Sequence, residues 1–257
     1  LPGRQPGAPG SFLRPRLSFP MQRQRVDAQP AYVLHTYPFR ETSLIVEVFS
    51  RDFGRVALLA RGARRPRSAL RGLLMAFQPL ELGWAGKGEV QTLMKAEWQG
   101  GQPLLSGKAL FCGYYLNELL MNLLPREDAH EKLFAAYVDT LRRFAEGVCE
   151  ADLRMFEHAL LAELGYGLTL AQDCEGHPVD PLAYYAYEIE RGAVRLDRAG
   201  NSALSVCGKT LLDLDREDFS DPRSLQESKQ LMRALMTHYL GGQPLETRKI
   251  FMELQEL

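Results

Sequence analysis

Long apolar runs are missing from this sequence of 257 residues. No window approaches the 18 or so uninterrupted apolar residues of a membrane-spanning helix, so we expect no transmembrane segment. The Pro-, Gly- and Arg-rich start also lacks the apolar stretch that a secretory signal needs. We therefore expect a cytoplasmic protein and interpret residues 1–29 as a disordered leader. Sequence upstream of Met21 and an organellar transit peptide remain alternatives for the first 20 residues.

Cysteine is scarce as well. Cys112, Cys149, Cys174 and Cys207 lie far apart in a chain without an export signal, so a disulfide framework is not expected. Cys174 and His177 have the local spacing of two zinc ligands, but a closed structural site needs four, and Cys207 has no second donor near it. We therefore predict no metal site and interpret His177 as a loop residue.

Signatures of catalysis are absent too. The sequence contains no Gly-x-Ser-x-Gly elbow, its five histidines are scattered, and nothing marks an activated nucleophile with its base. Gly208–Thr210 reads Gly-Lys-Thr, as in a phosphate-binding loop. However, Ala203 occupies the position of the first glycine of such a loop, so the amides cannot wrap around a phosphate. We predict no catalytic residue and no cofactor, and hence a protein that is not an enzyme.

Apolar residues between Ala31 and Trp98 come in five short bursts separated by turn signals. This is the pattern of strands rather than helices. Five strands in so few residues leave little room for a helix and predict a small closed barrel of the OB-fold type over residues 30–100. An SH3-like barrel is the structural alternative.

The apolar period changes to that of helices beyond the predicted barrel. Leu116 and Leu119 belong to the first of three amphipathic segments with short links, which predict a helical bundle over residues 101–167. Helical periodicity resumes over residues 206–257. The intervening residues 168–205 lose it and predict a loop and a short hairpin. The fold class is therefore α+β with several domains.

Positive charge is concentrated in one loop, although the whole chain has a formal charge of −1. The sequence between Ala31 and Gly72 has eight arginines and three acids, and four of these arginines lie in Arg61–Arg67. Like charges repel unless an anion binds them, and phosphate does so with release of counterions. On an OB-type barrel this loop predicts a nucleic-acid-binding surface, with a solvated basic loop as the alternative. Aromatic side chains for base stacking are Tyr37, Phe39, Phe53, Phe77 and Trp84, some of which must belong to the core.

A second basic feature lies in the predicted helical part. Arg154, together with Arg142 and Arg143 of the preceding helix, has the chemistry to bind a carboxylate. Surface ion pairs with Glu150 or Glu157 are the alternative interpretation.

Four segments, in this order, resemble the RecO family of bacterial recombination mediators. They are ARGAR at 60–64, YLNELL at 115–120, LLAELGYG at 160–167 and YLGGQPLETR at 239–248, within a resemblance that extends from Ala31 to Leu257. The family pattern has Ser where this chain has Thr247. The resemblance implies an OB-fold, a helical domain and a zinc-ribbon-like insert. Because only Cys174 stands where the first Cys pair of that insert would begin, we expect a degenerate, metal-free insert at 168–205.

The resemblance also implies a function in DNA repair and recombination without ATP hydrolysis. Such proteins bind single- and double-stranded DNA and anneal complementary strands. With RecR, and sometimes RecF, they load the recombinase RecA onto strands coated with single-stranded DNA-binding protein. They also bind the acidic C-terminal tail of that coating protein, which ends in an apolar residue with a free carboxylate.

The charge pattern and the resemblance together give two sets of candidate residues. The candidates for DNA contact are Arg55, Arg61, Arg64, Arg65, Arg67, Arg71 and Lys95. The candidates for binding the protein tail are Arg142, Arg143, Arg154, Phe156 and Leu160. The competing interpretations are a nucleic-acid-processing enzyme with a site hidden in the helical part and an OB module that binds RNA.

Overall fold

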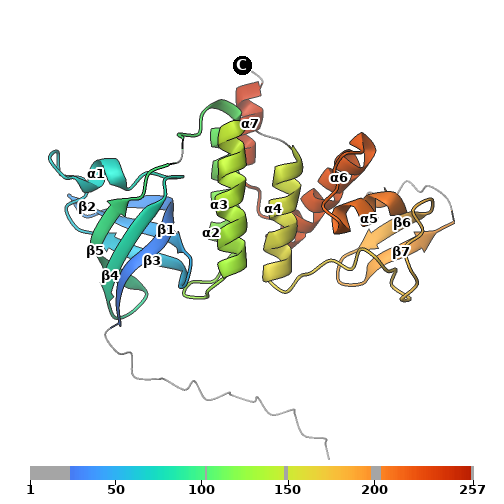
Figure 1. Ribbon diagram of the computed structural model, residues 1–257, viewed down its shortest axis with the longest axis horizontal. Coiled ribbons are helices and arrows are strands. Elements are labelled where there is room, and N and C mark those ends of the chain that lie inside the picture. Colours follow the sequence, from blue (N-terminus) through green and yellow to red (C-terminus); the bar gives the residue numbers. More distant parts are fainter. Residues whose placement is uncertain (1–23, 102, 148–149, 198–203, 256–257) are drawn as a thin grey trace, which may run out of the picture.

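The computed structural model describes residues 24–101, 103–147, 150–197 and 204–255. Figure 1 shows three parts in a row along the longest axis: a β-barrel, a group of helices and a small sheet. The helices lie between the barrel and the sheet. No helix in the described ranges is long and apolar enough to cross a membrane.

Five strands close the barrel in the order β1-β2-β3-β5-β4. They are β1 (Gln24–Phe39), β2 (Ser43–Ser50), β3 (Gly54–Ala60), β4 (Leu80–Gly86) and β5 (Val90–Trp98). Neighbouring strands are antiparallel except for β3 and β5, and the long β1 pairs with both β2 and β4. This arrangement confirms the predicted OB-fold. The short helix α1 (Leu70–Leu73) lies between β3 and β4.

The first strand begins before the predicted boundary of the barrel. Residues 24–29, which we assigned to the leader, pair with β4 as the first part of β1, so that boundary was wrong. Ala28 has a positive φ of 56°, and the pairing register shifts between Val26 and Gln29. Such a bulge interrupts the alternation by which a strand is detected in sequence. The rest of the predicted leader lies outside the described residues.

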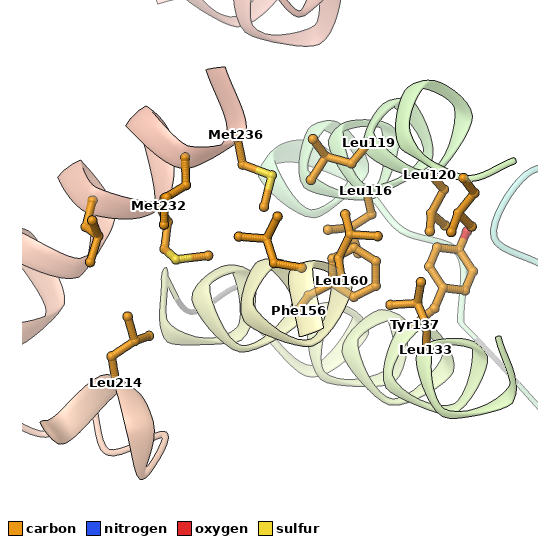
Figure 2. Close-up of a cluster of buried hydrophobic side chains, with 14 of the residues drawn as sticks. Leu116, Leu119, Leu120, Leu133, Tyr137, Phe156, Leu160, Leu214, Met232 and Met236 are labelled. Carbon is orange, nitrogen blue, oxygen red and sulfur yellow. The ribbon is translucent and has the colours of Figure 1, made fainter. Parts of the chain in front are cut away.

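The helical part shares its apolar core with one side of the barrel. Its helices are α2 (Gly107–Leu123), α3 (Glu131–Glu146), α4 (Glu150–Glu163), α5 (Gly208–Asp215), α6 (Pro222–Tyr239) and α7 (Glu246–Gln255). Figure 2 shows leucines and aromatic rings of α2, α3 and α4 meeting in the centre of the bundle, with methionines of α6 beside them. Tyr32, Leu34 and Phe49 of the barrel belong to the same buried cluster. Each such side chain stabilises the fold by about 1.5–3 kcal/mol.

A buried charge cluster also joins the barrel to the helices. The carboxylate of Glu47 on β2 is only 1% exposed and forms ion pairs with Arg55 of β3 and with Arg126 in the α2–α3 connection. Arg55 also donates a hydrogen bond to the carbonyl of Met121 on α2. The bonds of Glu47 to Arg126 and of Arg55 to Met121 cross from the barrel to the helical part, so they fix the orientation of the two parts.

The α2–α3 connection packs directly on the barrel at the start of β3. The amide of Glu127 donates to the carbonyl of Arg55 over 2.9 Å. Gly54 has a φ of +62°, and a Cβ at this position would lie 1.7 Å from the carbonyl oxygen of Asp128. Only glycine fits this close backbone approach.

The insert between α4 and α5 contains three strands in the order β7-β6-β8. β6 (Tyr184–Glu188) and β7 (Gly192–Leu196) form the predicted hairpin, and β8 (Ser205–Cys207) pairs with the other edge of β6. We did not predict β8, because three residues are too few to show alternation. Within the described ranges, no group of three or more His, Cys, Asp or Glu side chains is arranged to hold a metal ion. The likeness of the insert to a zinc ribbon stays a prediction.

Candidate nucleic-acid interface

The arginine-rich segment of residues 61–68, here the basic loop, connects β3 to α1 at one end of the barrel. Its four arginines and Arg71 on α1 are all exposed to solvent. In the part of the chain that the structure describes, none of these five side chains forms an ion pair with an acid. The five guanidinium groups therefore keep their positive charge available for an external anion.

Hydrogen bonds hold the backbone of the basic loop in place. The amide of Arg64 donates to the carbonyl of Thr42 over 2.8 Å, and the amide of Ser68 donates to the carbonyl of Arg65 over 3.0 Å. Gly62 takes the left-handed conformation with a φ of +67°, and Ala63 is buried in the barrel core. The loop thus presents charged side chains on a fixed backbone.

Arg55 and Lys95 lie apart from the basic loop. The Arg55 side chain is only 14% exposed and belongs to the junction with the helices, so the structure gives it a structural role instead of the predicted DNA contact. Lys95 on β5 forms ion pairs with Glu97 at 2.9 Å and with Glu81 at 3.8 Å. Its charge is balanced locally, so it is less available to a phosphate than the arginines of the basic loop.

Arg154, the predicted anchor for a carboxylate, is buried and already paired. Its Nη2 lies 2.7 Å from Oε1 of Glu157, and its Nη1 donates to the carbonyl of Lys229 over 3.3 Å. Tyr115 donates its hydroxyl to the same Glu157 oxygen over 2.5 Å. Burial raises the pKa of Glu157, and the charge of Arg154 and the hydrogen bond from Tyr115 oppose that shift. The alternative interpretation, an ion pair, is thus correct for Arg154, but the pair is buried.

The other four candidates for binding the tail do not gather around Arg154. Phe156 and Leu160 point into the centre of the bundle, where both are buried (Figure 2). Arg142 pairs with Asp139 on the exposed side of α3, and Arg143 pairs with Asp139 and Asp152. The structure therefore separates the predicted set. Residues i and i+2 on a helix lie on nearly opposite sides, so Phe156 cannot share the side of Arg154.

Arg154 does line an open cavity of about 610 Å³ between α2, α4, α6 and α7. Its apolar wall consists of Phe111, Leu153, Met236, Leu240, Leu245, Phe251 and Met252. Six cationic side chains also line it, against two acids, Glu150 and Glu157. An apolar cavity with an excess of positive charge suits a ligand that combines an apolar group with a carboxylate.

Three of the cavity's cations, Lys108, Arg233 and Arg248, form no ion pair with any residue of the described ranges. By contrast, Lys229 pairs with Glu150, and Lys249 pairs with Glu246. The sequence did not point to these three because they come from α2, α6 and α7, which are far apart along the chain. Only Arg248 fell within a segment that carried the family resemblance.

Comparisons with known proteins agree with that resemblance across both parts of the chain. The family model for the recombination protein O N terminal matches residues 24–101, and that for the recombination protein O C terminal matches residues 104–249. The chain belongs to the recombination protein O family.

Curated relatives support the assignment over nearly their whole length. DNA repair protein RecO of Dechloromonas aromatica is 71% identical over 239 residues, which cover 91% of this chain and 99% of the relative. The proteins of the same name from Aromatoleum aromaticum and Nitrosospira multiformis are 60% and 52% identical, over 92% of this chain and 99% of each relative. The chain is thus a member of a family of DNA repair proteins.

Proposed function

We propose that this protein is a recombination mediator that binds single- and double-stranded DNA through the basic loop and anneals complementary strands. It acts without hydrolysing ATP and helps RecA to load onto strands coated with single-stranded DNA-binding protein. RecR, and sometimes RecF, are its proposed partners in the bacterial cytoplasm. The exposed and unpaired arginines of the basic loop are the observation that carries this proposal. Neutralising phosphates lets two strands approach each other, and no covalent step is needed.

The first test is annealing of complementary strands coated with single-stranded DNA-binding protein, in the absence of nucleotide. We expect the wild type to anneal and the triple variant Arg64→Ala, Arg65→Ala, Arg67→Ala to lose this activity. The logarithmic salt dependence of single-strand binding should also fall by about two units, since each phosphate that an arginine neutralises contributes roughly 0.7.

A second triple variant controls for the loss of net charge. Arg142, Arg191 and Arg195 are exposed arginines outside the basic loop, and each is at least 60% exposed. Their joint replacement by Ala should leave both annealing and the salt slope near wild type. If both triple variants lost annealing and salt slope to the same extent, net charge rather than the basic loop would govern binding. If both kept them, the DNA site would lie outside the basic loop. A wild type that fails to anneal would contradict the mediator function itself.

We further propose that the cavity between α2, α4, α6 and α7 binds the C-terminal tail of single-stranded DNA-binding protein. The apolar wall suits the terminal side chain of that tail. Because Glu157 neutralises Arg154, the unpaired Arg233 and Arg248 are better placed to bind the terminal carboxylate. Lys108 is a third unpaired cation at the same cavity.

A labelled acidic peptide that ends in an apolar residue tests this assignment. The free-acid peptide should bind the wild type more tightly than its C-terminal amide. Arg248→Gln should remove that difference by weakening the free acid about tenfold, since a hydrogen bond to a charged group contributes roughly 1.5–3 kcal/mol. Arg142→Gln, a variant on α3 outside the cavity, should bind like the wild type. Equally weakened binding in the two variants would contradict the assignment to the cavity.

A further inference from the structure

The outer face of strands β1, β2 and β3 is only partly covered by helices. Val46 and Val48 of β2 point into the barrel, so Ile45 and Glu47 face outward, and Phe49 of the same outward row packs into the helical core. Cross-strand partners share a face of a sheet. His35 pairs with Glu47, and Tyr37 pairs with Ile45, so both lie on this outer face where it emerges from beneath the helices.

Three aromatic rings follow one another along this exposed part of β1. Successive residues of a strand alternate between its faces, so His35, Tyr37 and Phe39 lie in one row, with about 6.6 Å between neighbours. Tyr37 is 44% exposed, and its ring centroid lies 4.4 Å from that of His35. His35 is exposed as well, and Phe39 is half-buried. We call these three side chains the aromatic row.

The other three aromatic candidates of the barrel pack in or against the buried core. Phe77 is 3% exposed and Trp84 is 1% exposed, so both belong to the core. Phe53 packs edge-on against Trp84, with 5.5 Å between the ring centroids. Of the five aromatic residues that the sequence analysis named, Tyr37 and Phe39 thus lie together on the outer face of β1, and the structure places His35 beside them.

The aromatic row ends at the basic loop. The guanidinium of Arg40 lies 5.3 Å from the centre of the Phe39 ring. Nη1 of Arg64 donates to the carbonyl of Arg40 over 3.3 Å, and the amide of Gly62 donates to the hydroxyl of Ser43, the cross-strand partner of Phe39. One continuous surface therefore carries aromatic rings on the strand and guanidinium groups on the adjoining loop.

We propose that His35, Tyr37 and Phe39 form a stacking platform for the unpaired bases of a DNA strand whose phosphates are bound by the basic loop. Aromatic rings beside a positively charged surface are how proteins bind single strands without sequence preference. In a duplex the faces of the bases are covered by their neighbours, so a duplex can use the basic loop but not the aromatic row. The platform therefore selects unpaired strands, and it rests on the DNA-binding function proposed above.

An abasic strand separates stacking from charge. The probes are an oligothymidylate and a strand of abasic sites with the same number of phosphates, each bound to the full chain and followed by fluorescence anisotropy over a series of salt concentrations. The wild type should bind oligothymidylate at least tenfold more tightly than the abasic strand, since each stacked base contributes roughly a tenfold increase in affinity.

Tyr37→Leu keeps an apolar side chain but removes one ring of the row. In this variant the ratio of the affinity for oligothymidylate to that for the abasic strand should fall about tenfold, and the salt slope should stay at the wild-type value. Tyr114→Leu is the matched control, because Tyr114 on α2 is 43% exposed and lies outside the aromatic row. Circular dichroism of both variants verifies that they fold.

The outcomes for the platform and for the basic loop are distinct. If the wild type bound both strands equally, or if Tyr37→Leu kept the full preference, the platform would be wrong while DNA binding by the basic loop stood. If the wild type bound neither strand, the proposed DNA-binding function would fail, and the platform with it. A reduced salt slope with an unchanged preference is the expected behaviour of the arginine triple variant.

Discussion

Arg55 and Arg67 carry the same charge in opposite surroundings. Arg55 holds the buried Glu47 and the end of α2, whereas Arg67 is exposed and unpaired within the described ranges. Arg55→Ala should therefore lower the free energy of unfolding by about 2–3 kcal/mol, as expected for removing charged hydrogen bonds. Arg67→Ala should change it by less than about 0.5 kcal/mol.

DNA titrations in increasing salt should show the reverse order for the same two variants. Arg67→Ala should reduce the single-strand salt slope by about 0.7, and Arg55→Ala should leave it unchanged. Urea denaturation supplies the stability values. If Arg55→Ala unfolded with the same free energy as the wild type and had a reduced salt slope, Arg55 would be a DNA contact rather than a structural residue.

Glu157 gives a pH-dependent prediction. Burial raises the pKa of this carboxyl above its ordinary value of 4.5 despite the charge of Arg154 and the hydrogen bond from Tyr115. The folded state therefore holds the proton more tightly than the unfolded state does. Stability from this group is fully present below pH 4.5 and is lost as the pH rises through the raised pKa.

The variant Glu157→Gln cannot titrate and isolates this contribution. The difference in unfolding free energy between the wild type and Glu157→Gln should fall as the pH rises above 4.5. Urea denaturation of both proteins across this range measures it. A constant difference would show that folding leaves the pKa of Glu157 unchanged, and a difference that grows with pH would show that folding lowers it; either result would contradict the prediction.

At the scale of elements, the loop before β6 is held by a side chain. The carboxylate of Asp173 accepts hydrogen bonds from the amides of Glu175 and His177, each over 2.9 Å. Desolvation opposes ionisation of Asp173, but these two bonds and the nearby His177 outweigh it and lower the pKa of the carboxyl. Asp173 thus closes the turn in which Cys174 stands.

Asp173→Ala should open this turn without affecting the barrel. We expect faster hydrogen exchange at the amides of Glu175 and His177 in the variant, with unchanged exchange in β2 and β3. Added zinc should leave both exchange and the melting temperature of the wild type unchanged. A rise in melting temperature with zinc would contradict a metal-free insert.

Periodicity predicted most elements of the fold, and it failed where a strand is irregular or short. The short apolar bursts of β2 and β5 and the helical spacing of α2 were visible in the sequence. The start of β1 was hidden by its bulge at Ala28, and β8 has only three residues.

One of the two candidate sites could be predicted from the sequence, and the other could not. The basic loop is contiguous, so its composition alone predicted it. The cavity collects side chains from four helices, and no local pattern brings Lys108, Arg233 and Arg248 together. Phe156 and Leu160 were assigned to the tail site as neighbours of Arg154 in sequence, but rotation along the helix turns them into the core.

The whole molecule depends on the contact between the barrel and the α2–α3 connection. Gly54→Ala would place a Cβ 1.7 Å from the carbonyl of Asp128 in addition to straining a φ of +62°. Gly241→Ala is the matched control, since its φ is +65° and no other atom lies within 4 Å of the added Cβ. The control should cost about 1–2 kcal/mol of stability, the ordinary penalty of a left-handed residue.

Gly54→Ala should cost clearly more than this control, because the backbone of the connection has to move away from β3. Thermal unfolding of the two variants compares them directly. Equal melting temperatures would show that the α2–α3 connection can move away from β3 without loss of stability. The barrel and the helices would then be only loosely attached.

Firm attachment of the barrel determines how the two proposed sites act together. The charge cluster of Glu47, Arg55 and Arg126 holds the basic loop at a constant distance from the cavity. A DNA strand and the tail of a protein that coats it belong to one assembly, so capture of the first makes capture of the second intramolecular. The effective concentration then depends on that distance rather than on the amount of protein in solution. If both proposed sites are occupied in this way, a charge cluster that lies outside both of them contributes to the avidity for both ligands.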